Sequence, residues 1–273
     1  PATQVAGKVR AADGSVLSGV KVTAVVLDPA ATGARRDRWV TLKNGGNDVT
    51  TTTELDGTFR LDVPKDTPFR LSYAAAGRET RYYPSAVEPD EGQNITVAEN
   101  EVVTGRDATL PVLAQLGGSV VEADGSAYTS GGAVELWRRI NYTDNGEKGG
   151  PSHSTWVLVK RAALSNTGGF SFTTESGSYR LRADLTGSVQ GFLPDLVGLD
   201  EAAPVTLQPE QVLSLQQYAI PRKAQIRGKV TNLNGAPQSA KSVRGFYRYV
   251  TNIVDGAPVL SDWIGSVPAA GGT

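Results

Sequence analysis

The sequence has no cysteine, a single histidine and no long apolar segment. Without cysteine, the chain forms no disulfide bonds and uses no thiolate chemistry. The one histidine, His153, has no partner residues at the spacing that a metal site or an acid–base pair needs, and no Ser-His-Asp arrangement can be identified around it. No apolar run approaches the roughly 18 residues of a membrane-spanning helix. We therefore expect no enzyme activity, no cofactor or metal, and no insertion into a membrane.

An excess of charge of one sign is also lacking. The 27 basic and 28 acidic side chains leave a formal net charge of -1. Nucleic acids and anionic membranes select for clustered lysine and arginine, so this balance argues against both as partners. Glycine (31 residues), proline (15 residues), valine and threonine are plentiful, and such a composition suits strands and turns.

The sequence repeats itself, and this repetition is its most informative pattern. A short motif occurs three times, as TQVAGKV at Thr3–Val9, AQLGGSV at Ala114–Val120 and AQIRGKV at Ala224–Val230. A turn sequence follows each copy, at Asp13-Gly14, Asp124-Gly125 and Asn234-Gly235. These dipeptides are typical of hairpin turns because glycine, asparagine and aspartate tolerate a positive φ.

Other positions keep the same spacing along the chain. Gln4, Gln115 and Gln225 recur at an almost constant interval. Between the first two copies, matched pairs at this spacing are Phe59 with Phe170, Leu71 with Leu181, and Leu110-Pro111 with Ile220-Pro221. A constant offset over so many positions predicts three repeats, at residues 1–113, 114–222 and 223–273.

Apolar side chains alternate with polar ones within each repeat. Clear examples are Phe59, Leu61 and Val63, followed by Phe69, Leu71 and Tyr73. Such alternation is typical of half-buried strands, and no stretch shows convincing helical periodicity. About seven short strands in roughly 110 residues predict an all-β chain of tandem antiparallel β-sandwiches, Ig-like or transthyretin-like in architecture. Almost no spacer separates the repeats, and Pro111 and Pro221 stiffen the joints, so we expect a semi-rigid rod.

The two ends of the sequence lead to separate expectations. The third repeat reaches GGT at Gly271–Thr273, where the first repeat has DGT directly before Phe59. We expect this third repeat to be an incomplete sandwich that is ordered only when further residues or the strands of a neighbouring subunit complete it. The beginning allows two interpretations: a secretory leader was removed before Pro1, or an initiator methionine was trimmed from a protein that never had a leader.

The first repeat contains VAGKVRAADGSVLSGVKVTAVV and TTTELDGTFRLDVPKDTPFRLSYAAAG. These stretches resemble the carboxypeptidase regulatory-like, or transthyretin-like, β-sandwich family, and the resemblance covers both full repeats and the start of the third. It implies a β-sandwich that serves as spacer, stalk or adhesion module in bacterial surface, secreted or phage structural proteins. Such a fold does not by itself set the function.

Two relatives with special chemistry do not fit the residues. Pilin-type sandwiches with internal isopeptide bonds need a lysine, an Asn or Asp, and a buried acidic partner, but Ser119 and Glu135 replace Lys8 and Lys21 in the second repeat. Transthyretin-like hydrolases need several active-site histidines, and this chain has one. We therefore expect neither a self-formed cross-link nor hydrolysis.

The loop after the second predicted strand of each repeat varies in length and content while its flanks keep register. Each copy reaches a tryptophan (Trp39, Trp156 or Trp263), and the arginines near it are Arg35, Arg36, Arg38, Arg138, Arg139 and Arg248. Arginine with aromatic residues on variable loops favours recognition of a ligand or partner. The alternative is that the tryptophans pack in the core or on a sheet edge while the arginines are solvated. A second loop carries Tyr82 and Tyr83, for which packing at one end of the sandwich competes with binding.

Together these patterns predict a non-enzymatic array of structural or adhesion modules with an extracellular location. The array belongs either to a virion appendage of the phage tail or fibre type or to a bacterial surface stalk. The alternative is a set of accessory carbohydrate- or protein-binding domains of a larger secreted enzyme. The expected partners are other protein subunits or a host or cell-surface ligand, in a homo-oligomer or a larger assembly.

Overall fold

The structure, a computed structural model, describes residues 3–28, 30, 38–143, 152–186, 191–195, 198–221, 234, 243–254 and 257–267. These residues form strands and turns, with a short 3-10 helix at Pro89–Glu91. The chain divides into two compact units, residues 1–223 and 224–273. In the part that the structure describes, no helix is long and apolar enough to cross a membrane. The all-β fold predicted from the alternation of apolar residues is confirmed.

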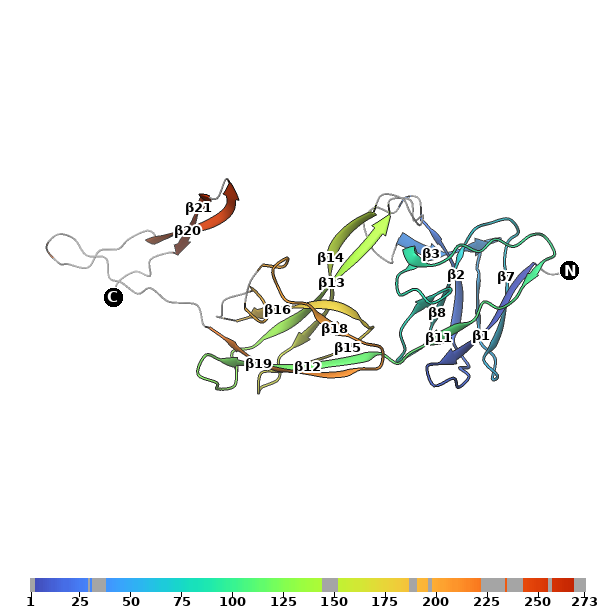
Figure 1. The fold of residues 1–273 in the computed structure, drawn as a ribbon, viewed down its shortest axis with the longest axis horizontal. Coiled ribbons are helices and arrows are strands. Elements are labelled where there is room, and N and C mark those ends of the chain that lie inside the picture. The colour runs from blue at the N-terminus through green and yellow to red at the C-terminus, as the bar shows by residue number, and fades with distance from the viewer. Residues whose placement is uncertain are drawn as a thin grey trace. The chain divides into compact units, whose positions relative to one another are not determined.

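The first hydrophobic core lies between two sheets built from residues 4–110 (Figure 1). In one sheet, β1 (Gln4–Ala11) pairs with β7 (Thr58–Asp62), β10 (Val102–Val103) and β11 (Ala108–Leu110). The other sheet has the order β3 (Trp39–Thr41), β2 (Lys21–Leu27), β8 (Arg70–Ala74) and β9 (Arg81–Tyr82), with β6 (Thr50–Thr52) also on β2. A hairpin of β4 (Lys43–Asn44) and β5 (Asn47–Asp48) interrupts the chain between β3 and β6.

A second core lies between the sheets of residues 114–220. One sheet has the order β15 (Gly169–Thr174), β12 (Ala114–Glu122) and β19 (Val212–Ile220). The other has the order β14 (Ser152–Ala163), β13 (Gly132–Thr143), β16 (Gly177–Leu185) and β17 (Gly191–Phe192), with β18 (Val205–Leu207) also on β16. The side chains that fill both cores are those whose alternation marked the strands, such as Phe59, Leu71 and Leu181.

The two sandwiches pair their strands in the same way. Gly7 faces Phe59 on β1 and β7, and Gly118 faces Phe170 on β12 and β15. The predicted antiparallel pairing holds for most strands, but the first strand runs parallel to the last: β1 to β10 and β11, and β12 to β19. Neighbouring strands that run in the same direction start at the same end of a sheet. The chain therefore enters each sandwich at one end and leaves it at the opposite end.

The described part of the second compact unit is a hairpin. Its strands β20 (Val243–Val254) and β21 (Ala257–Val267) pair antiparallel, from Val243 opposite Val267 to Val254 opposite Ala257. The third copy of the repeated motif and the final GGT lie outside the described residues. The boundaries of the three repeats and the incomplete third sandwich therefore stay predictions.

Two turn glycines recur at the same place in the two sandwiches. Gly57 and Gly168 have φ values of 79° and 77°. Their carbonyl oxygens accept the N–H groups of Val9 and Val120 at 2.8 and 2.9 Å. A Cβ on Gly57 would lie 2.7 Å from the oxygen of Val9, and a Cβ on Gly168 would lie 2.1 Å from that of Val120. The left-handed backbone and this close approach to the first strand explain why glycine directly precedes the strand with Phe59 in one repeat and the strand with Phe170 in the other.

Replacement of Gly168 by alanine should destabilise the second sandwich more than replacement of Gly125. Both glycines have a positive φ, which costs an L-residue about 1–2 kcal/mol, but a Cβ on Gly125 meets no atom within 4 Å. Gly168→Ala also forces the turn away from Val120. Hydrogen exchange of the core amides of β13 and β16 in the full chain measures the loss of stability in each variant. Equal losses in the two variants would contradict a destabilising contact between the added Cβ and Val120.

Candidate functional site

Trp39 forms a cluster with a buried arginine and an aspartate in the first sandwich. Trp39 starts β3, where it pairs with Leu27 of β2. The centroid of its indole ring lies 4.2 Å from Cζ of Arg70, and its indole N–H donates to Oδ1 of Asp90 at 2.5 Å. One face of the ring and its only polar group are therefore occupied by the protein itself.

Trp156 forms the same cluster in the second sandwich. It pairs with Arg139 of β13, the strand that corresponds to β2. Its ring centroid lies 4.4 Å from Cζ of Arg180, and its indole N–H donates to Oδ1 of Asp200 at 3.2 Å. In the second repeat, Arg180 and Asp200 stand at the positions that correspond to Arg70 and Asp90.

The arginine of the first cluster is held from several sides. Arg70 is 1% exposed, its Nε donates to Oδ1 of Asn94 at 2.9 Å, and its Nη1 donates to the carbonyl oxygen of Pro89. Burial lowers the pKa of Arg70, and the charge of Asp90 opposes that shift. The cluster fixes the Pro89–Glu91 turn against β8, which is a packing role.

The arginine of the second cluster has fewer partners. Nη1 of Arg180 donates to the carbonyl oxygen of Leu199 and lies 3.9 Å from the carboxylate of Asp200. Its buried Nε finds no partner among the described residues. Pro204 stands at the position that corresponds to Asn94, so the side-chain acceptor of the first cluster is missing here.

The structure describes only part of the other arginines predicted for binding. Arg35, Arg36 and the side chain of Arg248 lie outside the described residues. Arg38 is buried, and Arg139 donates to Oγ of Ser154 from Nε at 2.9 Å and from Nη2 at 2.6 Å. A binding role for this set stays a prediction.

The predicted tyrosines lie against the first sandwich. Tyr82 is buried on β9. Tyr83 is partly buried and packs against the first core, its hydroxyl accepts from Nη1 of Arg106 at 3.2 Å, and Cζ of Arg106 lies 5.0 Å from its ring centroid. These contacts match the packing interpretation of this loop, and the structure does not test its binding.

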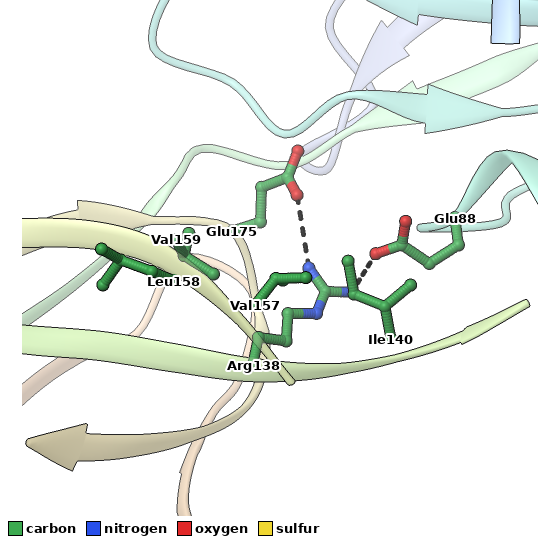
Figure 2. Close-up of a pocket in the computed structure, with 7 residues that line it drawn as sticks. All are labelled: Glu88, Arg138, Ile140, Val157, Leu158, Val159 and Glu175. Atoms are coloured by element: carbon green, nitrogen blue, oxygen red, sulfur yellow. Dashed lines mark ion pairs between the residues drawn. The ribbon is translucent and has the colours of Figure 1, made fainter. Parts of the chain in front are cut away.

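Arg138 joins the first sandwich to the second. Figure 2 shows its guanidinium between two carboxylates, with Nη2 2.7 Å from Oε1 of Glu88 and Nη1 3.5 Å from Oε2 of Glu175. Glu88 belongs to the first sandwich, whereas Arg138 and Glu175 belong to the second. Beside this bridge is an open hollow of about 270 Å³, whose apolar lining consists of Ile140, Val157, Leu158 and Val159.

A fully buried carboxylate lies at the same joint. Glu79 of the first sandwich accepts the N–H of Ser176 at 2.7 Å through Oε1 and the hydroxyl of Ser176 at 3.1 Å through Oε2. The same carboxylate forms an ion pair with Arg81, which is also buried. A buried charge is tolerated only when it is paired and hydrogen-bonded, so Glu79 ties the segment between β8 and β9 to the second sandwich.

The connecting segment is bonded to both sandwiches. The N–H of Glu79 donates to the carbonyl oxygen of Pro111 at 2.9 Å, and the N–H of Leu113 donates to that of Gly77 at 3.1 Å. The N–H of Val112 donates to Oε1 of Glu210 at 3.1 Å. The joint is therefore held by backbone bonds as well as by ion pairs.

The described residues contain no group of three histidine, aspartate or glutamate side chains that could hold a metal ion. Arg70 and Arg180 were not predicted as site residues, although the constant offset between the repeats places them at corresponding positions. Glu79 and Glu175 had no such signal, because Val189 and Lys65 stand at the corresponding positions of the other repeat.

No protein-family model matches the chain, and no curated protein does so either. The carboxypeptidase regulatory-like assignment therefore stays a prediction. Among solved structures, a streptococcal ancillary pilin is similar with 16% identity and a TM-score of 0.41, over 82% of this chain and 63% of that one. The minor pilin GBS52 of Streptococcus agalactiae has 12% identity and a TM-score of 0.39, over 84% of this chain and 100% of that one.

A third similar structure is the shaft pilin SpaA of Lactobacillus rhamnosus GG, with 11% identity and a TM-score of 0.34 over 83% of this chain and 100% of that one. The chain thus spans 63% of the length of the ancillary pilin. Likeness of this size carries no conclusion about function.

The Arg70 cluster should stabilise its sandwich more than the Arg180 cluster does. Arg70→Met removes its hydrogen bonds to Asn94 and Pro89, whereas Arg180→Met removes its hydrogen bond to Leu199. A hydrogen bond from a charged group contributes about 1.5–3 kcal/mol when it is buried and less when water can replace it. Denaturant unfolding of both variants of the full chain, followed by amide exchange in each core, checks this order. A larger loss for Arg180→Met would show that the extra partners of Arg70 contribute nothing.

Removal of the Glu79 carboxylate should strongly destabilise the joint. Glu79→Ala leaves Arg81 buried without its partner, a change that typically costs about 3–5 kcal/mol. The matched control is Lys65→Ala, which breaks the exposed pair with Glu99 at 2.9 Å and should cost less than about 1 kcal/mol. Thermal unfolding of the full chain gives both values, and similar losses would refute a special role for Glu79.

Proposed function

We propose that the chain is a non-enzymatic structural array of an extracellular appendage, in which the first two sandwiches act as a stiff spacer. The observation that carries this proposal is the parallel pairing of the first and last strands in both sandwiches. Each sandwich takes the chain from one of its ends to the other. Modules connected in this way add length with each repeat, which a spacer or stalk requires.

The joint supports the same proposal. Pro111, Val112 and Leu113 link the sandwiches directly, and each takes part in a hydrogen bond to a neighbouring segment. Arg138 and Glu79 add charged contacts whose geometry is specific. A joint made only of apolar contacts permits sliding, whereas paired buried charges tolerate few other arrangements.

Two settings fit such a spacer: a bacterial surface stalk and a virion appendage. In both, the expected partners are other protein subunits of the appendage or a ligand on a cell surface. The variable loops at residues 28–38 and 138–154 are the proposed contact regions, and much of them lies outside the described residues.

The stiffness of the joint is the testable core of this proposal. Because the sequence has no cysteine, spin labels can be attached at two introduced cysteines, Ala12→Cys and Ala123→Cys, which are exposed residues at corresponding turns. We expect a narrow distance distribution in the full chain by electron–electron double resonance. Adding Glu79→Ala and Arg138→Ala should broaden it, whereas adding Lys65→Ala should not. A broad distribution in the chain with the labels alone would exclude a stiff spacer.

A further inference from the structure

Among the described strands of the second sandwich, β14 lies at an open edge of its sheet. This strand is the last of its sheet and pairs on one side with β13, and the described residues provide no strand on its other side. Its pairing with β13 is regular over residues 152–158, and a register shift at Val159 follows. Leu158 and Val159 are 46% and 38% exposed, and Figure 2 shows them along the strand beyond Val157.

The first sandwich interrupts the corresponding edge. There, β2 pairs with the short strands β3 and β6, and the β4–β5 hairpin separates the two. Short and interrupted edge strands are a common protection against pairing with other chains. The tryptophans Trp39 and Trp156 mark the same position on the two edges, so the contrast between the sandwiches is direct.

The residues of the open edge favour pairing. Residues 152–158 read SHSTWVL, with no lysine, arginine, aspartate, glutamate, proline or glycine. Thr155, Trp156 and Val157 are of types enriched in strands, and an uncharged segment without proline or glycine can pair with another chain when it is exposed. The first charged residues, Lys160 and Arg161, come after the register shift.

We propose that residues 152–158 of β14 pair antiparallel with the same residues of a second copy of this chain. The two-fold axis passes at Thr155, because this position gives full overlap of the seven residues. Thr155 then faces Thr155 of the second copy, a cross-strand pair that is favourable in sheets. Each remaining residue faces its mirror position, so Ser154 lies opposite Trp156.

Charge selects the antiparallel direction and the second copy as the occupant. In a parallel, in-register pair, Lys160 and Arg161 of one copy would lie beside the same residues of the other, which is unfavourable. In the antiparallel pair, the two basic ends lie at opposite ends of the shared segment. The arrangement is self-complementary and closed, because the same surface of each copy is used up.

The contact is small, so we expect a weak dimer between free chains. The pairing rests on the edge alone, and its test does not depend on the stiffness of the joint.

Cross-linking tests the register directly. Residues directly opposite each other in an antiparallel pair have Cα atoms roughly 4.5–5.5 Å apart, within the reach of a disulfide bond. We expect Thr155→Cys to form a covalent dimer under mild oxidation of the full chain. A mixture of His153→Cys and Val157→Cys chains should cross-link more than either variant alone. Thr52→Cys, an exposed threonine on the edge strand β6, is the matched control and should stay monomeric.

A charge exchange tests the pairing without a covalent bond. Thr155→Lys and Thr155→Glu each place like charges opposite each other, so each should weaken the dimer at least tenfold in sedimentation equilibrium. An equal mixture of the two should associate again, and Thr52→Lys should have no effect. Unchanged amide exchange in the cores of β13 and β16 shows that the variants are folded.

Several outcomes would overturn the proposal. A chain that stays monomeric at the highest attainable concentration excludes self-pairing at this edge. Equal cross-linking of Thr52→Cys and Thr155→Cys indicates random collision. Growth into assemblies larger than a dimer contradicts a closed two-fold contact, and a monomer that instead binds an unrelated extended peptide assigns the edge to another partner.

Discussion

The pairing of the first strand of each sandwich with the last is the contact on which the rest of the described structure depends. In the first sandwich, Val9 faces Ala108, and in the second, Val120 faces Tyr218. Closing such long loops has an entropic cost that only the completed core offsets. Once closed, the parallel direction of these strands delivers the chain to the far end of the sandwich, where Pro111 and Leu113 meet the next module.

Much of the fold follows from two simple patterns in the sequence. The constant offset between the repeats predicts that they share one architecture, and alternation of apolar residues marks strands such as Phe59–Val63. Neither pattern carries strand direction, because alternation reads the same for parallel and antiparallel partners. The parallel return of β11 and β19 was therefore not predictable from alternation. The direction of these strands depends on the path by which the chain returns to the first strand, and alternation does not record that path.

The candidate site was harder to predict because its residues are covered by distant segments. Arg70 stands between the buried residues Phe69 and Leu71, so alternation places it on the outer face of β8. In the structure Trp39 and Pro89 cover that face, and Arg70 is among the most buried side chains of the protein. The tryptophans were found because they recur beside variable loops. Glu79 belongs to the joint between the two sandwiches. A comparison of the repeats cannot identify it, because the other repeat has no glutamate at the corresponding position.

The parallel pairing of β1 with β11 also determines how the first sandwich responds to mechanical load. A pull on the two ends of this module acts on β1 at its start and on β11 at its end. The two strands run in the same direction, and β11 pairs with residues 9–11 of β1. The force then shears the two strands along each other and loads their hydrogen bonds together. An antiparallel pair held at one end would open like a zipper, one bond after another. Shear geometry gives each sandwich resistance to tension, so an array of such modules would extend by unfolding whole sandwiches rather than by gradual fraying.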